Sequence, residues 1–244
     1  MATKRITKKQ AAEISRMGEI AERLKQVYPD VVCALEWGGQ YGGEEAFLLR
    51  ESWKLLVMGR LSAQCTDARV NIVCRELFEQ FPTVQAMADA SIEDIEAIVR
   101  PCGLYHTKAR NIKDACRILA EDYEGIVPDN MDALLALPGV GRKIANLLLG
   151  DIYKKGGVVT DTHCIRICGR LGFYPETVKD PLKVERILTP LIEEAEQSDF
   201  CHRIVQFGRD TCMAREPRCG ECPLRELCKH GNEKGVSPDK YGYR

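Results

Sequence analysis

The sequence has no long hydrophobic run and almost no net charge. Its longest apolar stretches fall far below the roughly 18 residues that a membrane span needs. Residues 1–17 are charged and lack the apolar core of a secretory signal. Lysine and arginine number 35 against 36 aspartate and glutamate residues, which gives a formal charge of -1. We therefore expect a cytoplasmic protein without a membrane segment, and any affinity for nucleic acid must come from local patches.

The sequence also lacks alternating strand patterns, solenoid repeats and low-complexity segments. Apolar residues recur instead at steps of three and four, as on the buried face of an α-helix. Start and stop signals agree with this, because Ser91 and Asn130 precede predicted helices and Gly125 follows one. The chain is therefore predicted to be all-α. The predicted helices span 8–27, 52–63, 67–80, 92–100, 106–123, 131–136, 142–153, 163–171, 182–196 and 199–211.

Two segments show no helical periodicity. Residues 33–48, CALEWGGQYGGEEAFL, contain four glycines and are predicted to form a loop. Residues 231–244 are predicted to be a flexible tail. The full length of 244 residues is enough for one large core or two modest domains.

Cysteine is unusually frequent, with 12 residues. Scattered cysteines in a reducing compartment behave as small buried hydrophobes, whereas clustered cysteines are better explained as ligands of a metal. Cys212, Cys219, Cys222 and Cys228 lie within 17 residues and can bind zinc or an iron-sulfur cluster. A zinc ribbon typically has two C-x2-C pairs and this segment has one. The spacing predicts a metal centre and leaves the metal open.

A second motif, LPGVGRKIA at 137–145, joins two predicted helices. Pro138 ends the first helix, and Gly139 and Gly141 permit a sharp turn that brings backbone N–H groups close to a ligand. The positive dipole end of the second helix favours an anion there, such as a DNA phosphate. A plain tight turn between helices is the alternative. The charges favour the anion site, because residues 142–170 contain six Lys or Arg against two Asp.

A third motif, VVTDTHCIR at 158–166, contains Asp161 immediately before a predicted helix. By itself Asp161 would be explained as the N-cap of that helix. Lys143, however, lies in the first turn of the helix after the hairpin, where the dipole disfavours the ammonium form. A nearby carboxylate could accept a proton from such an amine or stabilise a cationic sugar. Lys143 and Asp161 are therefore a candidate amine nucleophile and its acid-base partner.

Together the three motifs resemble the endonuclease III family of helix-hairpin-helix DNA glycosylases. LPGVGRKIA is followed, 18 residues after its lysine, by Asp-Thr-His and then by C-x6-C-x2-C-x5-C. The resemblance extends over roughly 56–229. It includes LSAQCTD at 61–67, GLYHTKARNI at 103–112 and AREPRCG at 214–220.

This resemblance implies a two-domain, all-α helix-hairpin-helix DNA glycosylase fold. A six-helix barrel that contains the hairpin is expected at 45–155. A cluster domain, formed by 1–44 and 156–230, is expected to hold a 4Fe-4S cluster on the four spaced cysteines, and the tail follows at 231–244. DNA is expected to bind between the two domains.

The resemblance also implies a bifunctional DNA glycosylase and AP lyase of base excision repair. Its substrate would be double-stranded DNA with damaged bases, above all oxidised pyrimidines, or abasic sites. Lys143 would attack the anomeric carbon of a flipped nucleotide, expel the base and form a Schiff base, with nicking by β-elimination and assistance from Asp161. We expect a bacterial monomer that associates with the nucleoid through DNA.

Two of the implied DNA contacts enter the base stack. Gln64 would fill the gap left by the flipped base, and Leu104 would wedge between bases. Without the resemblance, Gln64 would be explained as a surface residue at a helix end and Leu104 as a loop anchor. The full set of implied DNA-binding residues is Gln64, Leu104, Gly139, Gly141, Arg142 and His163.

The sequence departs from the family pattern in several places. Residues 30–55 follow a different sequence and could alter substrate choice. Ile144 replaces a common Thr, Cys65 a common Ala, and Thr160 an apolar residue.

Three other functions remain as alternatives. The adenine-glycosylase branch generally lacks a lysine at position 143 and carries a long additional C-terminal domain. A non-catalytic helix-hairpin-helix DNA-binding protein with a four-cysteine zinc site would not need Lys143. A ferredoxin-like electron carrier would leave the hairpin without a role.

Overall fold

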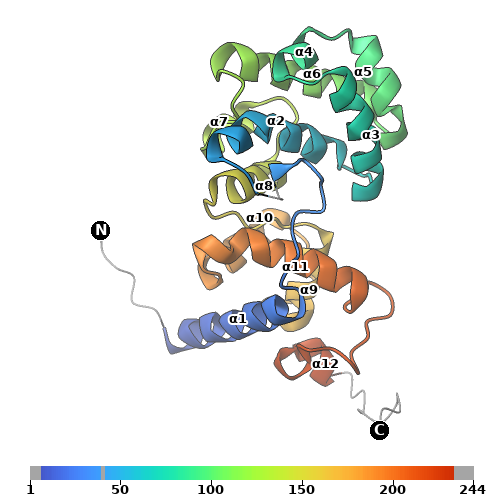
Figure 1. The fold of residues 1–244 in the computed structure, drawn as a ribbon. Coiled ribbons are helices and arrows are strands. Elements are labelled where there is room, and N and C mark those ends of the chain that lie inside the picture. The colour runs from blue at the N-terminus through green and yellow to red at the C-terminus, as the bar shows by residue number, and fades with distance from the viewer. Residues whose placement is uncertain (1–6, 40–41, 234–244) are drawn as a thin grey trace. The chain divides into compact units, whose positions relative to one another are not determined.

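The computed structural model describes residues 7–39 and 42–233. Within these ranges the protein consists of α-helices and short 3-10 turns and contains no β-strand (Figure 1). The all-α prediction is therefore confirmed. No helix in the described ranges is both long and apolar enough to cross a bilayer. The chain divides into two compact units, one made of 1–32 and 156–244 and the other of 33–155.

The unit formed by residues 33–155 contains seven α-helices among its described residues. Its core includes Trp53, which packs edge-on against Phe78 with ring centroids 5.2 Å apart. A Cβ added at Gly59 would lie 3.3 Å from Ile144, so this glycine permits close packing of the two helices on which they lie. The helices are α2 (Glu45–Leu61), α3 (Asp67–Gln80), α4 (Val84–Asp89), α5 (Ile92–Val99), α6 (Tyr105–Asp122), α7 (Met131–Ala136) and α8 (Arg142–Tyr153).

Two helix predictions for this unit were wrong. Helix α2 begins at Glu45 and not at 52, so the predicted loop ends before 48. The four glycines all lie before the helix, and Glu45 in the first turn interacts favourably with the helix dipole. Helix α4 was not predicted, because its six residues are too few to show a periodicity. The Thr83 hydroxyl caps it by accepting a hydrogen bond from the N–H of Ala86 at 3.0 Å.

The segment that departs from the family sequence packs on α3. Cys33, Leu35 and Trp37 are buried in the core of this unit. Asn71 of α3 accepts a hydrogen bond from the N–H of Glu36 at 3.1 Å and donates one to the carbonyl of Ala34 at 3.0 Å. These contacts place the described part of 33–44 with the barrel helices, whereas the sequence analysis grouped it with the cluster domain.

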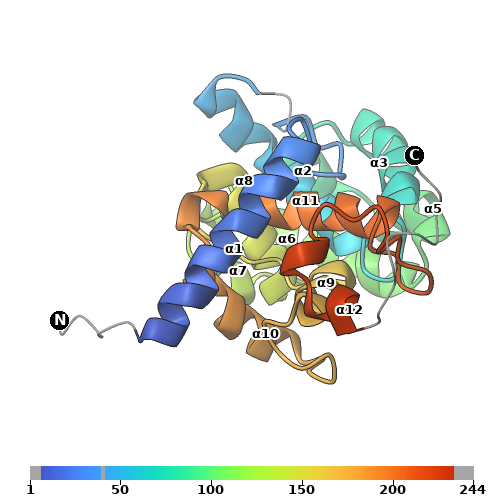
Figure 2. The same ribbon diagram turned by 90° about the horizontal axis from the view of Figure 1, so that it is seen from below.

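The other unit combines the N-terminal helix with the C-terminal helices. Helix α1 (Lys8–Val27) packs on α11 (Gln197–Asp210), and α9 (Thr162–Leu171) packs on both α11 and α12 (Lys229–Glu233) (Figure 2). Apolar side chains of α1 and α11 meet in its core. They are Met17, Ile20 and Leu24 of α1 and Phe200, Ile204 and Phe207 of α11.

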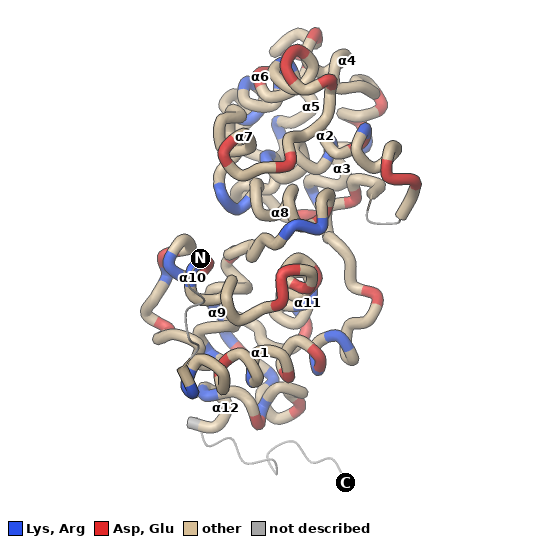
Figure 3. The backbone as a smooth tube through the Cα atoms, turned by 90° about the vertical axis from the view of Figure 1, so that its left-hand side faces the viewer, with Lys and Arg blue, Asp and Glu red and all other residues tan. Residues whose placement is uncertain are grey.

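The helix predicted at 182–196 is interrupted. Helix α10 (Pro181–Leu188) is followed by 3-10 turns at Thr189–Leu191 and Glu194–Glu196. Pro190 has no N–H to donate to the carbonyl one turn before it, so the α-helical hydrogen bonds end there. Of the predicted tail, residues 231–233 belong to α12, and 234–244 lie outside the described residues. Segments with Lys or Arg and segments with Asp or Glu are scattered over both units (Figure 3).

Candidate functional site

The helix-hairpin-helix turn lies between α7 and α8. Asn130 caps α7 by accepting a hydrogen bond from the N–H of Ala133 at 2.9 Å. Gly139 has a φ of +76°, which an L-residue adopts only with strain. It rests on an Arg60–Asn111 pair, in which the Asn111 amide oxygen accepts from Nε and Nη2 of Arg60 at 3.1 and 3.0 Å. The hairpin is therefore seated on α2 and α6.

The N-terminus of α8 is open at Gly141, its N-cap. No side chain caps it, and a Cβ added at Gly141 would meet nothing within 4 Å. Arg142 and Lys143, the first two residues of α8, are exposed. Uncapped N–H groups at the positive end of a helix, next to two cations, form a surface suited to an anion such as phosphate.

Asp161 is the N-cap of α9. Its Oδ1 accepts a hydrogen bond from the N–H of Cys164 at 2.7 Å, and the side chain is half-buried. His163 is half-buried as well, with Nδ1 3.3 Å from Nη2 of Arg166. Asp161 therefore caps α9, as the simpler interpretation of the sequence predicted. The cap uses only Oδ1, so Oδ2 of the carboxylate is not needed for it.

Gln64 and Leu104 share an unusual backbone conformation. Gln64 has φ +55° and lies in the turn between α2 and α3, and Leu104 has φ +51° and precedes α6. Both side chains are exposed, Leu104 to 61%. A left-handed conformation costs a residue with a Cβ about 1–2 kcal/mol, so the fold holds these two exposed side chains in turns that they would not adopt by themselves.

The two turns are in contact through their neighbours. Cys65 follows Gln64, and its thiol lies beside that of Cys102, the last residue of the 3-10 turn Arg100–Cys102. Burial raises the pKa of Cys102 to about 11, and the adjacent Cys65 contributes to the increase. Lys108 of α6 is fully buried beneath both turns. Sequence reasoning assigned no role to this lysine, although it is part of the GLYHTKARNI match.

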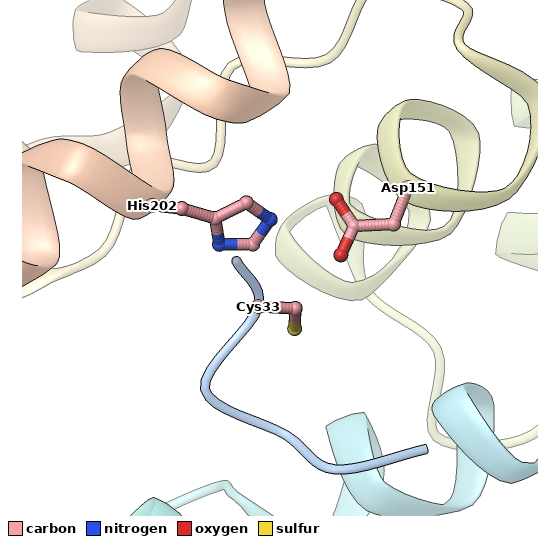
Figure 4. A group of neighbouring side chains, drawn as sticks. All are labelled: Cys33, Asp151 and His202. Atoms are coloured by element: carbon pink, nitrogen blue, oxygen red, sulfur yellow. The ribbon is translucent and has the colours of Figure 1, made fainter. Parts of the chain in front are cut away.

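Cys33 and Asp151 form a separate pair within the same unit, with the thiol sulfur within 4.8 Å of a carboxylate oxygen (Figure 4). Burial raises the pKa of Cys33 well above its usual value, and the hydrogen bond to Asp151 and the negative charge of Asp151 add to it. Cys33 is therefore a protonated thiol that donates to a carboxylate. The pair anchors the divergent segment to α8 and does not supply a thiolate nucleophile.

The four spaced cysteines form one site in the other unit. All four are half-buried and line a single cavity. Apolar side chains, including Ile167, Phe207 and Leu224, also line it. Burial raises the pKa of Cys222 to about 12, so a metal that binds here must displace protons from the thiols.

The spacing of the sulfurs favours an iron-sulfur cluster over a single zinc ion. Around one zinc ion, Zn–S bonds of about 2.3 Å in tetrahedral geometry put the sulfurs about 3.8 Å apart. Within the described residues, no three of these four sulfurs lie within 4.8 Å of one another. Four thiols spread around a cavity with apolar walls fit a larger, cubane-type group, so the donor set suits a 4Fe-4S cluster.

Two arginines of α9 hold the loop that carries these cysteines. Arg170 donates to the carbonyls of Met213 at 2.7 Å and Ala214 at 2.8 Å, and Arg166 donates to the carbonyl of Cys212 at 3.0 Å. Arg170 is 8% exposed. The interpretation of 142–170 as one basic surface was therefore wrong for these two residues, because their charges are directed into the protein. Arg142, Lys143, Lys154 and Lys155 are exposed.

Comparisons with known proteins agree with this geometry. A model of the HhH-GPD superfamily of base excision DNA repair proteins matches residues 57–194, and the iron-sulfur binding domain of endonuclease III matches 212–228. Endonuclease III of Synechocystis sp. is 39% identical, with 91% of this chain and 96% of that protein aligned. Endonuclease III of Escherichia coli K12 is 36% identical, with 87% of this chain and 94% of that protein aligned.

Solved structures show the same similarity. A trapped endonuclease III–DNA covalent intermediate matches with a TM-score of 0.79 at 36% identity, covering 91% of this chain and 98% of that one. A thermostable thymine-DNA glycosylase matches with a TM-score of 0.75 at 18% identity, covering 90% and 98% of the two chains. The second likeness concerns the fold alone.

Proposed function

The chain belongs to the endonuclease III family of helix-hairpin-helix base excision repair proteins, and from this premise we propose that Lys143 and Asp161 carry out its chemistry. The protein is a DNA glycosylase and AP lyase, and it carries a 4Fe-4S cluster. The observation that supports Lys143 as the nucleophile is its exposed position in the first turn of α8, directly after the hairpin.

The reaction that we propose begins with a damaged base, most simply an oxidised pyrimidine, extruded from double-stranded DNA. The Lys143 amine attacks the anomeric carbon, and the bond from that carbon to the base breaks. The sugar ring then opens at its C1′–O4′ bond, which leaves the sugar attached to the enzyme as a Schiff base. β-Elimination then breaks the strand. Asp161 accepts the proton from the amine or stabilises the cationic sugar.

DNA is held by groups on both units. We propose that Gly139, Gly141 and Arg142 bind a backbone phosphate at the start of α8. Gln64 fills the space of the extruded base, Leu104 wedges into the stack, and His163 contacts DNA beside Asp161. The iron-sulfur cluster is bound by the four spaced cysteines and orders their loop. Its chemistry is structural, since neither base removal nor elimination needs a redox step.

We further propose that the protein acts as a monomer on DNA in the bacterial nucleoid. The relatives described above come from bacteria, which supports the bacterial part of this proposal. We propose that the barrel domain comprises residues 45–155 together with the segment 33–44 that packs on it, and that the cluster domain comprises residues 1–32 and 156–230.

Borohydride trapping tests the nucleophile. Duplex DNA with an oxidised pyrimidine or an abasic site is incubated with the protein and sodium borohydride, which reduces a Schiff base to a stable adduct. We expect an adduct with the wild type and none with Lys143→Gln. Lys154→Gln is the matched control, because Lys154 is an exposed lysine at the other end of α8. The absence of an adduct with the wild type would favour the non-catalytic DNA-binding alternative, and an undiminished adduct with Lys143→Gln would show that another amine is the nucleophile.

Asp161 allows its structural and catalytic roles to be separated. Asparagine caps helices about as well as aspartate, so Asp161→Asn should leave the thermal midpoint almost unchanged while removing the carboxylate. We expect its single-turnover rate of base removal to fall by about 100-fold, within the range of general acid-base contributions. Asp161→Ala should also lose about 1 kcal/mol of stability with the cap. Wild-type turnover by Asp161→Asn would show that the residue is only a cap.

A further inference from the structure

Lys108 is the least ordinary buried residue of the barrel unit. Its side chain is 0% exposed. Lysine is almost never fully buried unless it is paired, because removing its ammonium from water is costly. The titratable groups that act on it are the thiols of Cys102 and Cys65 and the guanidinium of Arg60. Its hydrogen bonds must therefore explain why the fold retains it.

Those hydrogen bonds connect two separate turns. Nζ of Lys108 donates to the carbonyl of Leu61 at 2.8 Å and to the carbonyl of Cys102 at 2.8 Å. Leu61 ends α2, three residues before Gln64, and Cys102 lies two residues before Leu104. One ammonium group thus ties together the starts of the two turns that present Gln64 and Leu104.

The connection continues through the helix of Lys108 itself. Leu104 is the N-cap of α6, and its carbonyl accepts a hydrogen bond from the N–H of Lys108 at 3.0 Å. The left-handed conformations of Gln64 and Leu104 need support from their surroundings. A buried group that holds both turns supplies such support and fixes the distance between them.

We propose that Lys108 is a positioning residue that couples the Gln64 and Leu104 turns, so that both side chains enter DNA as one rigid unit. This inference rests on the proposed role of these two residues in base extrusion. Lys108 touches neither the DNA nor the reacting atoms. It acts because binding and extrusion are faster when both inserting groups are already ordered.

The first test compares two substrates with Lys108→Met, which retains the apolar stem and removes the ammonium. One substrate is a duplex with an oxidised pyrimidine, which must be extruded, and the other is a single strand with an abasic site, which has no base to extrude. We expect the single-turnover rate on the duplex to fall by about 100-fold, as for misplaced positioning groups. The rate of borohydride trapping on the single strand should change less than about threefold, because the Lys143 chemistry is intact.

Lys113→Met is the matched control. Lys113 lies on the same helix, and its Nζ also donates to a backbone carbonyl, that of Ala90, away from both turns. It should lose stability without the selective loss on duplex. Equal losses on both substrates with Lys108→Met, or the same duplex-selective loss with Lys113→Met, would overturn the proposal. A wild type that forms no adduct on either substrate would refute the proposed function instead.

A second test does not depend on the folding of a Lys108 variant. Gln64→Ala, Leu104→Ala and the double variant are compared on the duplex in the wild-type background. If the two turns act as one unit, the loss in the double variant should be smaller than the product of the single losses, by about tenfold. Multiplicative losses would show that the turns act independently, and the proposal would fail.

Discussion

Gly139 offers the sharpest test of how the hairpin is built. Its φ of +76° is in the left-handed region. An alanine Cβ there would lie 2.6 Å from Nε of Arg60 and 2.6 Å from an amide atom of Asn111, closer than real contacts allow. Gly139→Ala must therefore strain the backbone, separate the Arg60–Asn111 pair, or move the hairpin away from α2 and α6.

The cost can be estimated from these contacts. A left-handed alanine costs about 1–2 kcal/mol, and weakening the two hydrogen bonds from Arg60 to Asn111 costs about 1–2 kcal/mol more. A total near 3 kcal/mol corresponds to a fall in thermal midpoint of about 6–12 °C for a chain of this size. Thermal scans at one fixed rate, followed by circular dichroism, would measure the difference.

Gly141→Ala is the matched control within the same turn. Gly141 has an ordinary φ of -101°, and a Cβ there would meet nothing within 4 Å. We expect its thermal midpoint to fall by less than about 4 °C, because only an N-cap preference is lost. Its DNA affinity should fall, however, because the Cβ would project where we place a phosphate. Equal midpoints for Gly139→Ala and the wild type would refute the steric reasoning, as would an equal fall in both variants.

Two further predictions concern groups away from the hairpin. Burial raises the pKa of Tyr153 to about 12, above its value of 10.0 in the unfolded chain, and its hydroxyl donates to the carbonyl of Val127. The stability that Tyr153 contributes should therefore be complete below pH 10 and disappear as the pH rises through about 12. The difference in free energy of unfolding between the wild type and Tyr153→Phe should shrink over that range. A constant difference would contradict this assignment. Cys219→Ser should lose iron, the blue-region absorbance and DNA affinity, because a missing ligand removes folding energy from the loop, whereas Cys65→Ser should retain its iron. Normal iron content in Cys219→Ser would count against a four-cysteine cluster.

Local signals were enough to predict most helices. Ser91 and Asn130 are N-caps, as predicted, and their side chains accept from the N–H groups of Asp94 and Ala133. Errors arose where a second effect outweighed the periodicity. Pro190 interrupts an amphipathic stretch that otherwise continues to 196. Helix α4 is stabilised by its cap and by packing on α6, and neither can be deduced from six residues.

The candidate site was harder to predict from the sequence than the helices were. The sequence does not show whether a charged side chain is directed to solvent or to the protein interior. Arg166 and Arg170 were counted with a basic surface, but they donate to carbonyls of the cysteine loop. Lys108 lies inside a recognised motif, yet its role depends on two carbonyls, one of them 47 residues away. Ile144, a departure from the family pattern, is explained by its packing on Gly59.

Asn71 has a consequence for how this protein could be altered. It holds the divergent segment through the N–H of Glu36 and the carbonyl of Ala34, and so recognises backbone and not side chains. These two hydrogen bonds do not depend on which side chains the segment carries. Exchanges of exposed residues in this segment should therefore preserve its attachment, provided that Asn71 and the buried Leu35 and Trp37 are kept. The segment is a natural graft point for new loops in engineered glycosylases.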